Sequence, residues 1–119
     1  MKRNPLLYVQ DILKSIESIE SFLGEVSFKE FIRDNKTSDA VIYRLDVIGE
    51  ASKNVPKKIK DRYKGVPWTD LAKMRDKIAH SYFGVDFEIV WNVVKQKLPE
   101  IRREMEGILK DSQKGTFFE

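Results

Sequence analysis

The sequence has no cysteine among its 119 residues and only one histidine. The first absence excludes disulfide bonds, thiolate zinc sites and thiol nucleophiles, and it fits a reducing compartment. With a single histidine, a structural zinc site lacks ligands. No apolar run approaches the roughly 20 residues that span a bilayer, and the chain shows no signal peptide pattern. We therefore expect a cytoplasmic protein without a membrane association.

Several other kinds of catalytic site lack their residues as well. No serine lies in a strand-to-helix elbow, and the six glycines form no phosphate-binding loop. The acidic residues are spread along helix faces, whereas a magnesium-dependent nuclease needs carboxylates that converge. We expect neither a metal nor a cofactor.

The sequence does contain apolar residues at helical spacing through most of its length. In the first predicted helix, which Gly24 can end, these residues are Val9, Ile12, Ile16, Ile19 and Leu23. The segment 28–32 is predicted to pack as a cap or a turn. The next long helix is apolar over a wide arc and should be central, because Ala40, Tyr43, Val47 and Ala51 form a second stripe beside Val41, Leu45, Ile48 and Val55.

Local signals predict where the later helices begin and end. The predicted caps and breaks are Thr37 or Ser38, Pro56, Pro67 or Thr69, Gly84, Asp86 and Pro99. No alternating run of strand length appears, so we predict an all-α fold, a four- to five-helix antiparallel bundle. We assign residues 1–110 to this domain and 111–119 to a C-terminal tail that frays, unless Phe117 and Phe118 dock on the bundle.

Positive charge is concentrated in one stretch of the chain. The cations Lys53, Lys57, Lys58, Lys60, Arg62 and Lys64 stand against Asp61 alone. Such a stripe can follow a phosphate backbone, or it can be a solvated linker and helix face. A net charge of +3 does not by itself indicate nucleic acid.

One group of residues can carry RNA chemistry: Arg75, His80 and Tyr82. A neutral imidazole can take the proton of a ribose 2′-hydroxyl, and a guanidinium binds phosphate oxygens in a bidentate fork. Each residue also has an ordinary structural interpretation, as a helix-end histidine, a surface ion-pair partner and a packed aromatic ring. Glu50 can pair with Arg75, orient His80 or cap a neighbouring element.

Helix geometry separates these side chains. On a continuous helix, Arg75 and His80 stand about 140° apart at 100° per residue, and Tyr82 shares the face of Arg75. Either the helix unwinds near His80, or a second copy of the chain completes the site.

Taken together, the motifs resemble those of HEPN-domain proteins, specifically the HepT-like toxins of HEPN/nucleotidyltransferase toxin–antitoxin systems. The matching segments follow the family's order along almost the whole chain. They are Asn4-Pro5-Leu6-Leu7-Tyr8, Ile48-Gly49-Glu50-Ala51, Pro67-Trp68, Met74-Arg75-Asp76, Ala79-His80-Ser81-Tyr82-Phe83-Gly84-Val85-Asp86, Val90-Trp91 and Leu98-Pro99.

This resemblance implies a homodimer in which two copies of the Arg75–His80 motif share a cleft. It implies a metal-independent endoribonuclease toxin with Arg75 and His80 as catalytic residues, and supporting roles for Glu50 and Asp76. It further implies that a nucleotidyltransferase antitoxin neutralises the toxin by adding AMP to Tyr82. The alternative is a non-catalytic partner that presents RNA or nucleotide to the nucleotidyltransferase.

Overall fold

The computed structural model describes residues 3–78 and 84–114, and these fold into helices without a strand. The elements are α1 (Leu6–Leu23), α2 (Phe28–Arg33), α3 (Asn35–Asn54), α4 (Lys57–Arg62), α5 (Trp68–Ala72), α6 (Met74–Ile78), α7 (Phe87–Asn92), the π-helical turn η1 (Val93–Lys97) and α8 (Leu98–Gln113). The predicted all-α fold is confirmed. Of the helices described, none combines the length and apolar character needed to cross a membrane.

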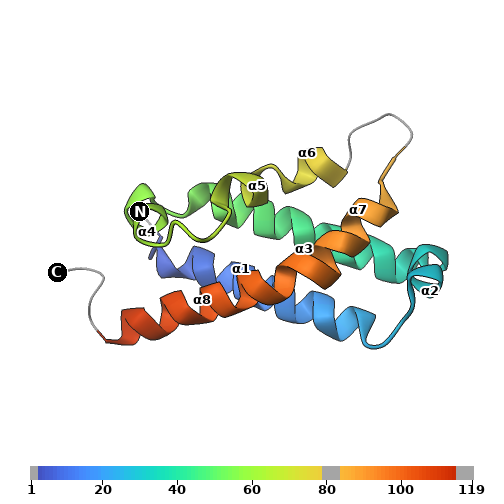
Figure 1. Ribbon diagram of the computed structural model, residues 1–119, viewed down its shortest axis with the longest axis horizontal. Helices are drawn as coiled ribbons and strands as arrows, with labels where there is room; N and C mark the ends of the chain where they lie inside the picture. The colour runs from blue at the N-terminus through green and yellow to red at the C-terminus, as the bar shows by residue number, and fades with distance from the viewer. Residues whose placement is uncertain (1–2, 79–83, 115–119) are drawn as a thin grey trace.

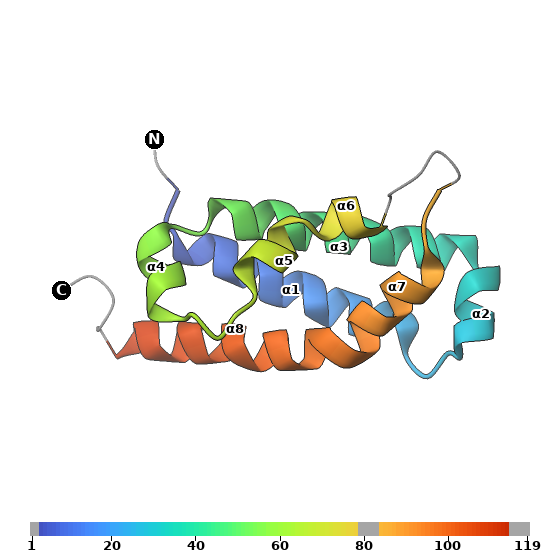
Figure 2. The same cartoon turned by 45° about the horizontal axis from the view of Figure 1, so that its top comes forward.

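The bundle is built on three long helices that run along its major axis (Figure 1). Helix α1 packs against both α3 and α8 and runs antiparallel to each. Helices α5 and α6 lie on α3, and α6 also contacts α7. Figure 2 shows that α4 lies at the same end as the start of α1 and the end of α8, while α2 lies at the opposite end.

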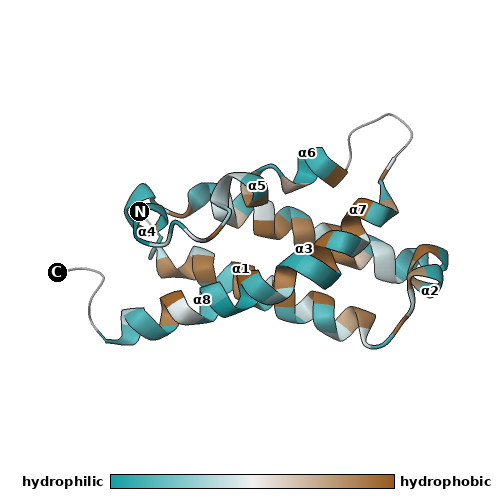
Figure 3. Cartoon of the chain, viewed as in Figure 1, coloured by the Kyte–Doolittle hydropathy of each residue, from teal (hydrophilic) through white to brown (hydrophobic). Residues whose placement is uncertain are grey.

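The predicted apolar stripes form the core. All five apolar residues assigned to the first helix are buried, as are Val41, Leu45, Ile48, Val90, Val94, Leu98, Ile101, Met105 and Ile108. Figure 3 shows hydrophobic and hydrophilic stretches alternating along the long helices. This pattern is what amphipathic helices around one core require. In the second stripe only Ala51 is buried, whereas Ala40 and Val47 are partly buried and Tyr43 is 62% exposed.

The start of α3 differs from its prediction. Asp34, rather than Thr37 or Ser38, caps this helix, and its carboxylate accepts hydrogen bonds from the backbone N–H of Thr37 at 3.2 Å and the hydroxyl of Thr37 at 2.6 Å. These bonds, the hydroxyl one foremost, lower the pKa of Asp34. The segment predicted as a cap or turn is the short helix α2, which Ser27 and Glu30 begin with a reciprocal capping box.

The end of α1 and the start of α7 lie where the sequence predicts them. Gly24 ends α1 with a φ of +51°, a conformation that favours glycine. Asp86 caps α7 by accepting from the N–H groups of Glu88 and Ile89 at 3.0 and 3.1 Å. The expected third helix is divided at Lys73 into α5 and α6. Its predicted inward residues Leu71, Met74 and Ile78 are buried.

The last long segment continues past Pro99, as predicted, through a π-helical turn. Pro99 has no N–H and its ring clashes with the carbonyl four residues earlier in a regular α-helix. The wider turn η1 precedes it, and the N–H of Leu98 donates to the carbonyl of Val93. The π turn thereby lets α7, η1 and α8 follow one another without a loop.

Candidate functional site

The residues singled out from the sequence lie on two helices and one segment. Arg75 and Asp76 lie on α6, Glu50 lies on α3, and all three are exposed. His80 and Tyr82 belong to residues 79–83 and lie outside the described part of the chain.

Arg75 and Glu50 line the same groove, whose volume is about 420 Å³. The groove runs between the first turns of α1, one face of α3 and the α5–α6 pair. Its lining residues are Arg3, Tyr8, Asp11, Tyr43, Asp46, Val47, Gly49, Glu50, Ala51, Lys53, Asn54, Ala72 and Arg75. Asp76 is not among them. The structure thus brings Arg75 and Glu50 to one surface.

Gly49 explains how α3 and the α5–α6 pair come so close. A Cβ at position 49 would lie 3.2 Å from the carbonyl oxygen of Leu71 and 3.8 Å from that of Ala72. Because glycine has no side chain, the backbone that carries Arg75 can rest directly on α3. Gly49 therefore sets the position of Arg75 relative to Glu50.

The charge of Arg75 is not neutralised within the part of the chain that the structure describes, where it makes no ion pair or hydrogen bond. Glu50 instead accepts from Lys53 at 3.2 Å. Of the alternatives for Glu50, pairing with Arg75 is excluded in this arrangement. Arg75 is left available to an anion from outside.

The two flanks of segment 79–83 meet at the end of α6. The backbone N–H of Asp86 donates to the carbonyl of Ile78 at 3.1 Å. Ile78 follows Arg75 by three residues, which is less than one helical turn, or about 4.5 Å along the axis. Asp86, which caps α7, is therefore held at the end of α6, within about one helical turn of Arg75.

Sequence reasoning missed several groove residues. The spacing of apolar residues places Tyr43 in an apolar stripe, but Asp39, Asp46 and Glu50 share its side of the helix, and this polar pattern signals its exposure. Arg3 also lines the groove, and no motif in the sequence points to it. It donates to Asp11 at 2.8 Å and lies 4.7 Å from the ring centre of Tyr8, and the bond to Asp11, above all, raises the pKa of Arg3.

Of the three cations that line the groove, Arg3 and Lys53 pair with Asp11 and Glu50, and Arg75 alone makes no ion pair among the described residues. Within residues 3–78 and 84–114, no three histidine, aspartate or glutamate side chains gather closely enough to hold a metal ion. A guanidinium without a protein partner can bind a phosphate through two parallel hydrogen bonds.

Comparison with known proteins gives a consistent result. The family model described as "Ribonuclease HepT-like" matches residues 12–108. A protein of Thermococcus cleftensis named "Probable ribonuclease HepT" is 44% identical over 110 residues, covering 92% of this chain and 100% of that protein. MJ0127 of Methanocaldococcus jannaschii, named provisionally as an RNase, is 43% identical over 110 residues, which cover 92% of this chain and 91% of its own length. No solved structure matches the chain significantly.

Proposed function

The chain belongs to the HepT-like ribonuclease family, and on this premise we propose that it is a metal-independent endoribonuclease. The observation that carries the proposal is the state of Arg75, which lines a groove, is exposed and makes no ion pair among the described residues. Its relatives are named for ribonuclease activity, and a free guanidinium is what binding of an RNA phosphate requires.

The proposed reaction uses the ribose next to the cut bond. His80, as the neutral imidazole, removes the proton of the 2′-hydroxyl, whose oxygen then attacks the phosphorus. The bond from phosphorus to the 5′ oxygen breaks, and that oxygen takes up a proton as it leaves. The products are a 2′,3′-cyclic phosphate and a 5′-hydroxyl. Arg75 stabilises the negative charge of the phosphorane, which is typically worth about 100- to 1,000-fold in rate.

We propose that the working unit is a homodimer. Arg75 and His80 lie about 140° apart if α6 continues as a regular helix, so a second copy of the chain supplies the missing partner of each. Glu50 and Asp76 have supporting roles on the two helices that meet at Gly49.

The biological role that we propose is that of a cytoplasmic toxin controlled by a nucleotidyltransferase antitoxin. Addition of AMP to Tyr82 would put a bulky anion beside Arg75, where it competes with the RNA phosphate. Incubation with the cognate nucleotidyltransferase and ATP is expected to add the mass of AMP to the intact protein. An equal mass gain in a Tyr82→Phe variant would exclude this tyrosine as the site.

The decisive test of the function is RNA cleavage in the presence of EDTA. The wild-type protein should cut RNA, and Arg75→Ala or His80→Ala should reduce the rate at least about 100-fold while the helical circular dichroism is unchanged. Arg103→Ala is the matched control, because Arg103 is an exposed arginine on α8 away from the groove. Cleavage that survives both site substitutions would show that the mechanism is wrong.

The same experiment separates the alternative function, a non-catalytic binding partner of a nucleotidyltransferase. RNA binding without any product, even with protein in excess over RNA, would favour that alternative. Binding that depends on Arg75 but not on His80 would point to phosphate recognition without proton transfer.

A further inference from the structure

We propose that the end of the bundle formed by α4, here called the basic end, binds the phosphate backbone of single-stranded RNA on one side of the cut site. The basic end comprises Arg3, Lys53, Lys57, Lys58, Lys60, Arg62, Lys64, Lys110 and Lys114. This inference rests on the proposed ribonuclease function and names how that site holds its substrate beyond the cleaved bond.

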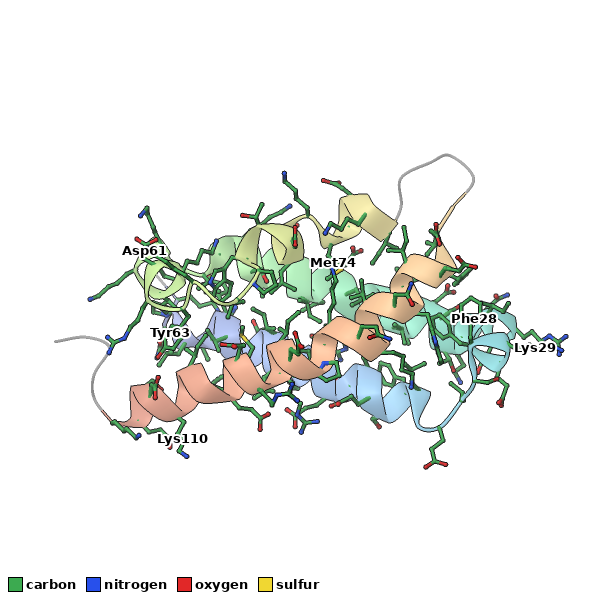
Figure 4. The ribbon with its side chains drawn as sticks, in the orientation of Figure 1. Phe28, Lys29, Asp61, Tyr63, Met74 and Lys110 are labelled. Carbon is green, nitrogen blue, oxygen red and sulfur yellow. The ribbon has the colours of Figure 1, made fainter. Side chains whose placement is uncertain are left out.

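The first supporting observation is that distant parts of the sequence bring their positive charge to the same place. Tyr63, directly after α4, donates from its hydroxyl to Asp111 of α8 at 2.6 Å. This bond links the end of α8, where Lys110 lies, to the residue that follows α4 (Figure 4). Four acidic residues contact this end: Asp111 accepts from Tyr63, and Asp61, Asp11 and Glu50 pair with Lys57, Arg3 and Lys53, so the nine cations still outnumber the acids.

The second observation is that the backbone of the basic end is fixed to the core. Val55, Ile59 and Val66 are each only 3% exposed. The indole N–H of Trp68 donates to the carbonyl of Tyr63 at 3.0 Å. The basic side chains therefore project from an ordered helix instead of a flexible linker, and the experiment below separates phosphate binding from a solvated helix face.

The third observation is continuity with Arg75. Arg3 and Lys53 line the groove that also contains Arg75. The ion pair of Lys53 with Glu50 joins two side chains that are more than half exposed, so it competes weakly with a phosphate. Glu50 lies four residues, or about 6 Å, before the end of α3 at Asn54, and Val55 and Pro56 lead from there directly into α4.

At the opposite end of the bundle, the residues that the structure describes form no comparable surface. Around α2, the cations Lys29, Arg33 and Lys36 alternate with Glu30 and Asp34. Positive charge on one side of the groove thus favours an RNA strand that extends toward the basic end.

The test compares two triple variants with the same change in net charge. Lys57→Ala, Lys60→Ala and Lys64→Ala alter the basic end, whereas Lys14→Ala, Lys29→Ala and Lys36→Ala are the control. Each triple variant lowers the formal net charge from +3 by three. Binding is measured with an uncleavable 2′-O-methyl RNA 12-mer over a range of salt concentrations, and cleavage with an unmodified 12-mer and with a dinucleotide.

We expect the basic-end variant to bind the 12-mer at least about tenfold more weakly at low salt, and its salt slope to fall by about 2, which is roughly 0.7 for each lost phosphate contact. The KM for the 12-mer should rise, while the dinucleotide is cut as by wild type. The control variant should match wild type in both assays.

The outcomes separate this inference from the proposed function. Equal binding of the 12-mer by both triple variants would overturn the inference, even if dinucleotide cleavage supports the nuclease. If wild type cuts nothing, but only the basic-end variant loses salt-dependent binding, the nuclease proposal fails and the RNA-binding surface stands.

Discussion

The hydroxyl of Tyr63 joins α4 to α8, and its titration reports on that contact. Burial, followed by the hydrogen bond to Asp111 and the charge of that carboxylate, raises the pKa of Tyr63 to about 12. The neutral phenol is therefore favoured in the folded state relative to the unfolded chain, in which the pKa is about 10. The stabilisation is complete below about pH 10 and is lost as the pH rises through about 12.

Tyr63→Phe should lower the free energy of unfolding by about 1–2 kcal/mol at pH 7, because the hydrogen bond to a charged acceptor is removed. Urea unfolding at pH 7 and pH 11 measures this, and the difference between wild type and variant should shrink at the higher pH. Tyr43→Phe is the control, because Tyr43 is 62% exposed and its hydroxyl should contribute almost nothing. Equal stability of the two variants would contradict a role for the Tyr63 hydroxyl.

Arg75 shows what residue types alone can reveal. The sequence singled it out because a guanidinium suits phosphate, and the structure gives it an exposed, unpaired position among the described residues. The partner of Glu50 could not be chosen in the same way. Glu50 pairs with Lys53, three residues later on α3, and this local pair was one of several that the sequence allowed. The roles of Arg75, His80 and Tyr82 stay predictions.

At the scale of elements, the close packing of α3 on α5 depends on Gly49. Glycine normally weakens a helix by about 1 kcal/mol relative to alanine. At position 49 a methyl group would press on the Leu71 carbonyl at 3.2 Å, and a backbone group cannot turn aside as a flexible side chain can. Gly107, on α8, has nothing within 4 Å of an added Cβ. The two glycines are therefore expected to respond differently.

Gly107→Ala should raise the free energy of unfolding by about 0.5–1 kcal/mol, whereas Gly49→Ala should lower it by about 1 kcal/mol, since the α5–α6 pair must move. Thermal unfolding of both variants tests this comparison. RNA cleavage should fall only in Gly49→Ala, because Arg75 moves with α6. An equal rise in Tm for both would show that α5 does not rest on Gly49.

The existence of the helices was predictable from the sequence, but several of their boundaries were not. Buried positions recur every three or four residues, and this period is visible without a structure. At the start of α3, Asp34, Thr37 and Ser38 are all good capping residues, and only the chain path selects Asp34. The division of the third helix at Lys73 and the π turn before Pro99 arise from packing and backbone geometry.

The groove was not predictable for a similar reason. It is formed by α1, α3 and the α5–α6 pair, which are far apart in sequence, and its width depends on one close backbone approach at Gly49. Tyr43 lies on the same surface. An aromatic residue in an apolar pattern is predicted to be in the core, and its exposure becomes evident only when the position of the neighbouring helix is known.

At the scale of the whole molecule, α1 and α8 are held together outside the core by charge. Arg102 of α8 pairs with Glu17 at 3.9 Å and with Glu20, both on α1, and with Glu106 at 3.4 Å. These contacts lie on exposed side chains and add little each, although a network exceeds an isolated pair. The long antiparallel frame can thus keep the groove and the basic end on one rigid support.

A dimer with shared sites should allow two inactive variants to complement each other, whereas a monomer or a dimer with separate sites should not. If each site takes Arg75 from one subunit and His80 from the other, a heterodimer of Arg75→Ala and His80→Ala subunits contains one site with both residues intact and one with neither. Two separate sites would each lack one residue, and both would be inactive. The two variants should therefore be inactive alone but active when mixed.

Mixing equal amounts of the two variants and allowing the subunits to exchange should restore about a quarter of the wild-type activity, because half of the dimers are mixed and each of those has one working site of two. Cleavage of RNA in EDTA after refolding the two variants together measures this recovery. A mixture of Arg75→Ala with Arg75→Ala/His80→Ala is the control, since no subunit in it supplies Arg75. A lack of recovery, with mixed dimers detected by mass, would mean that one subunit holds both residues and that the chain must turn sharply after Ile78.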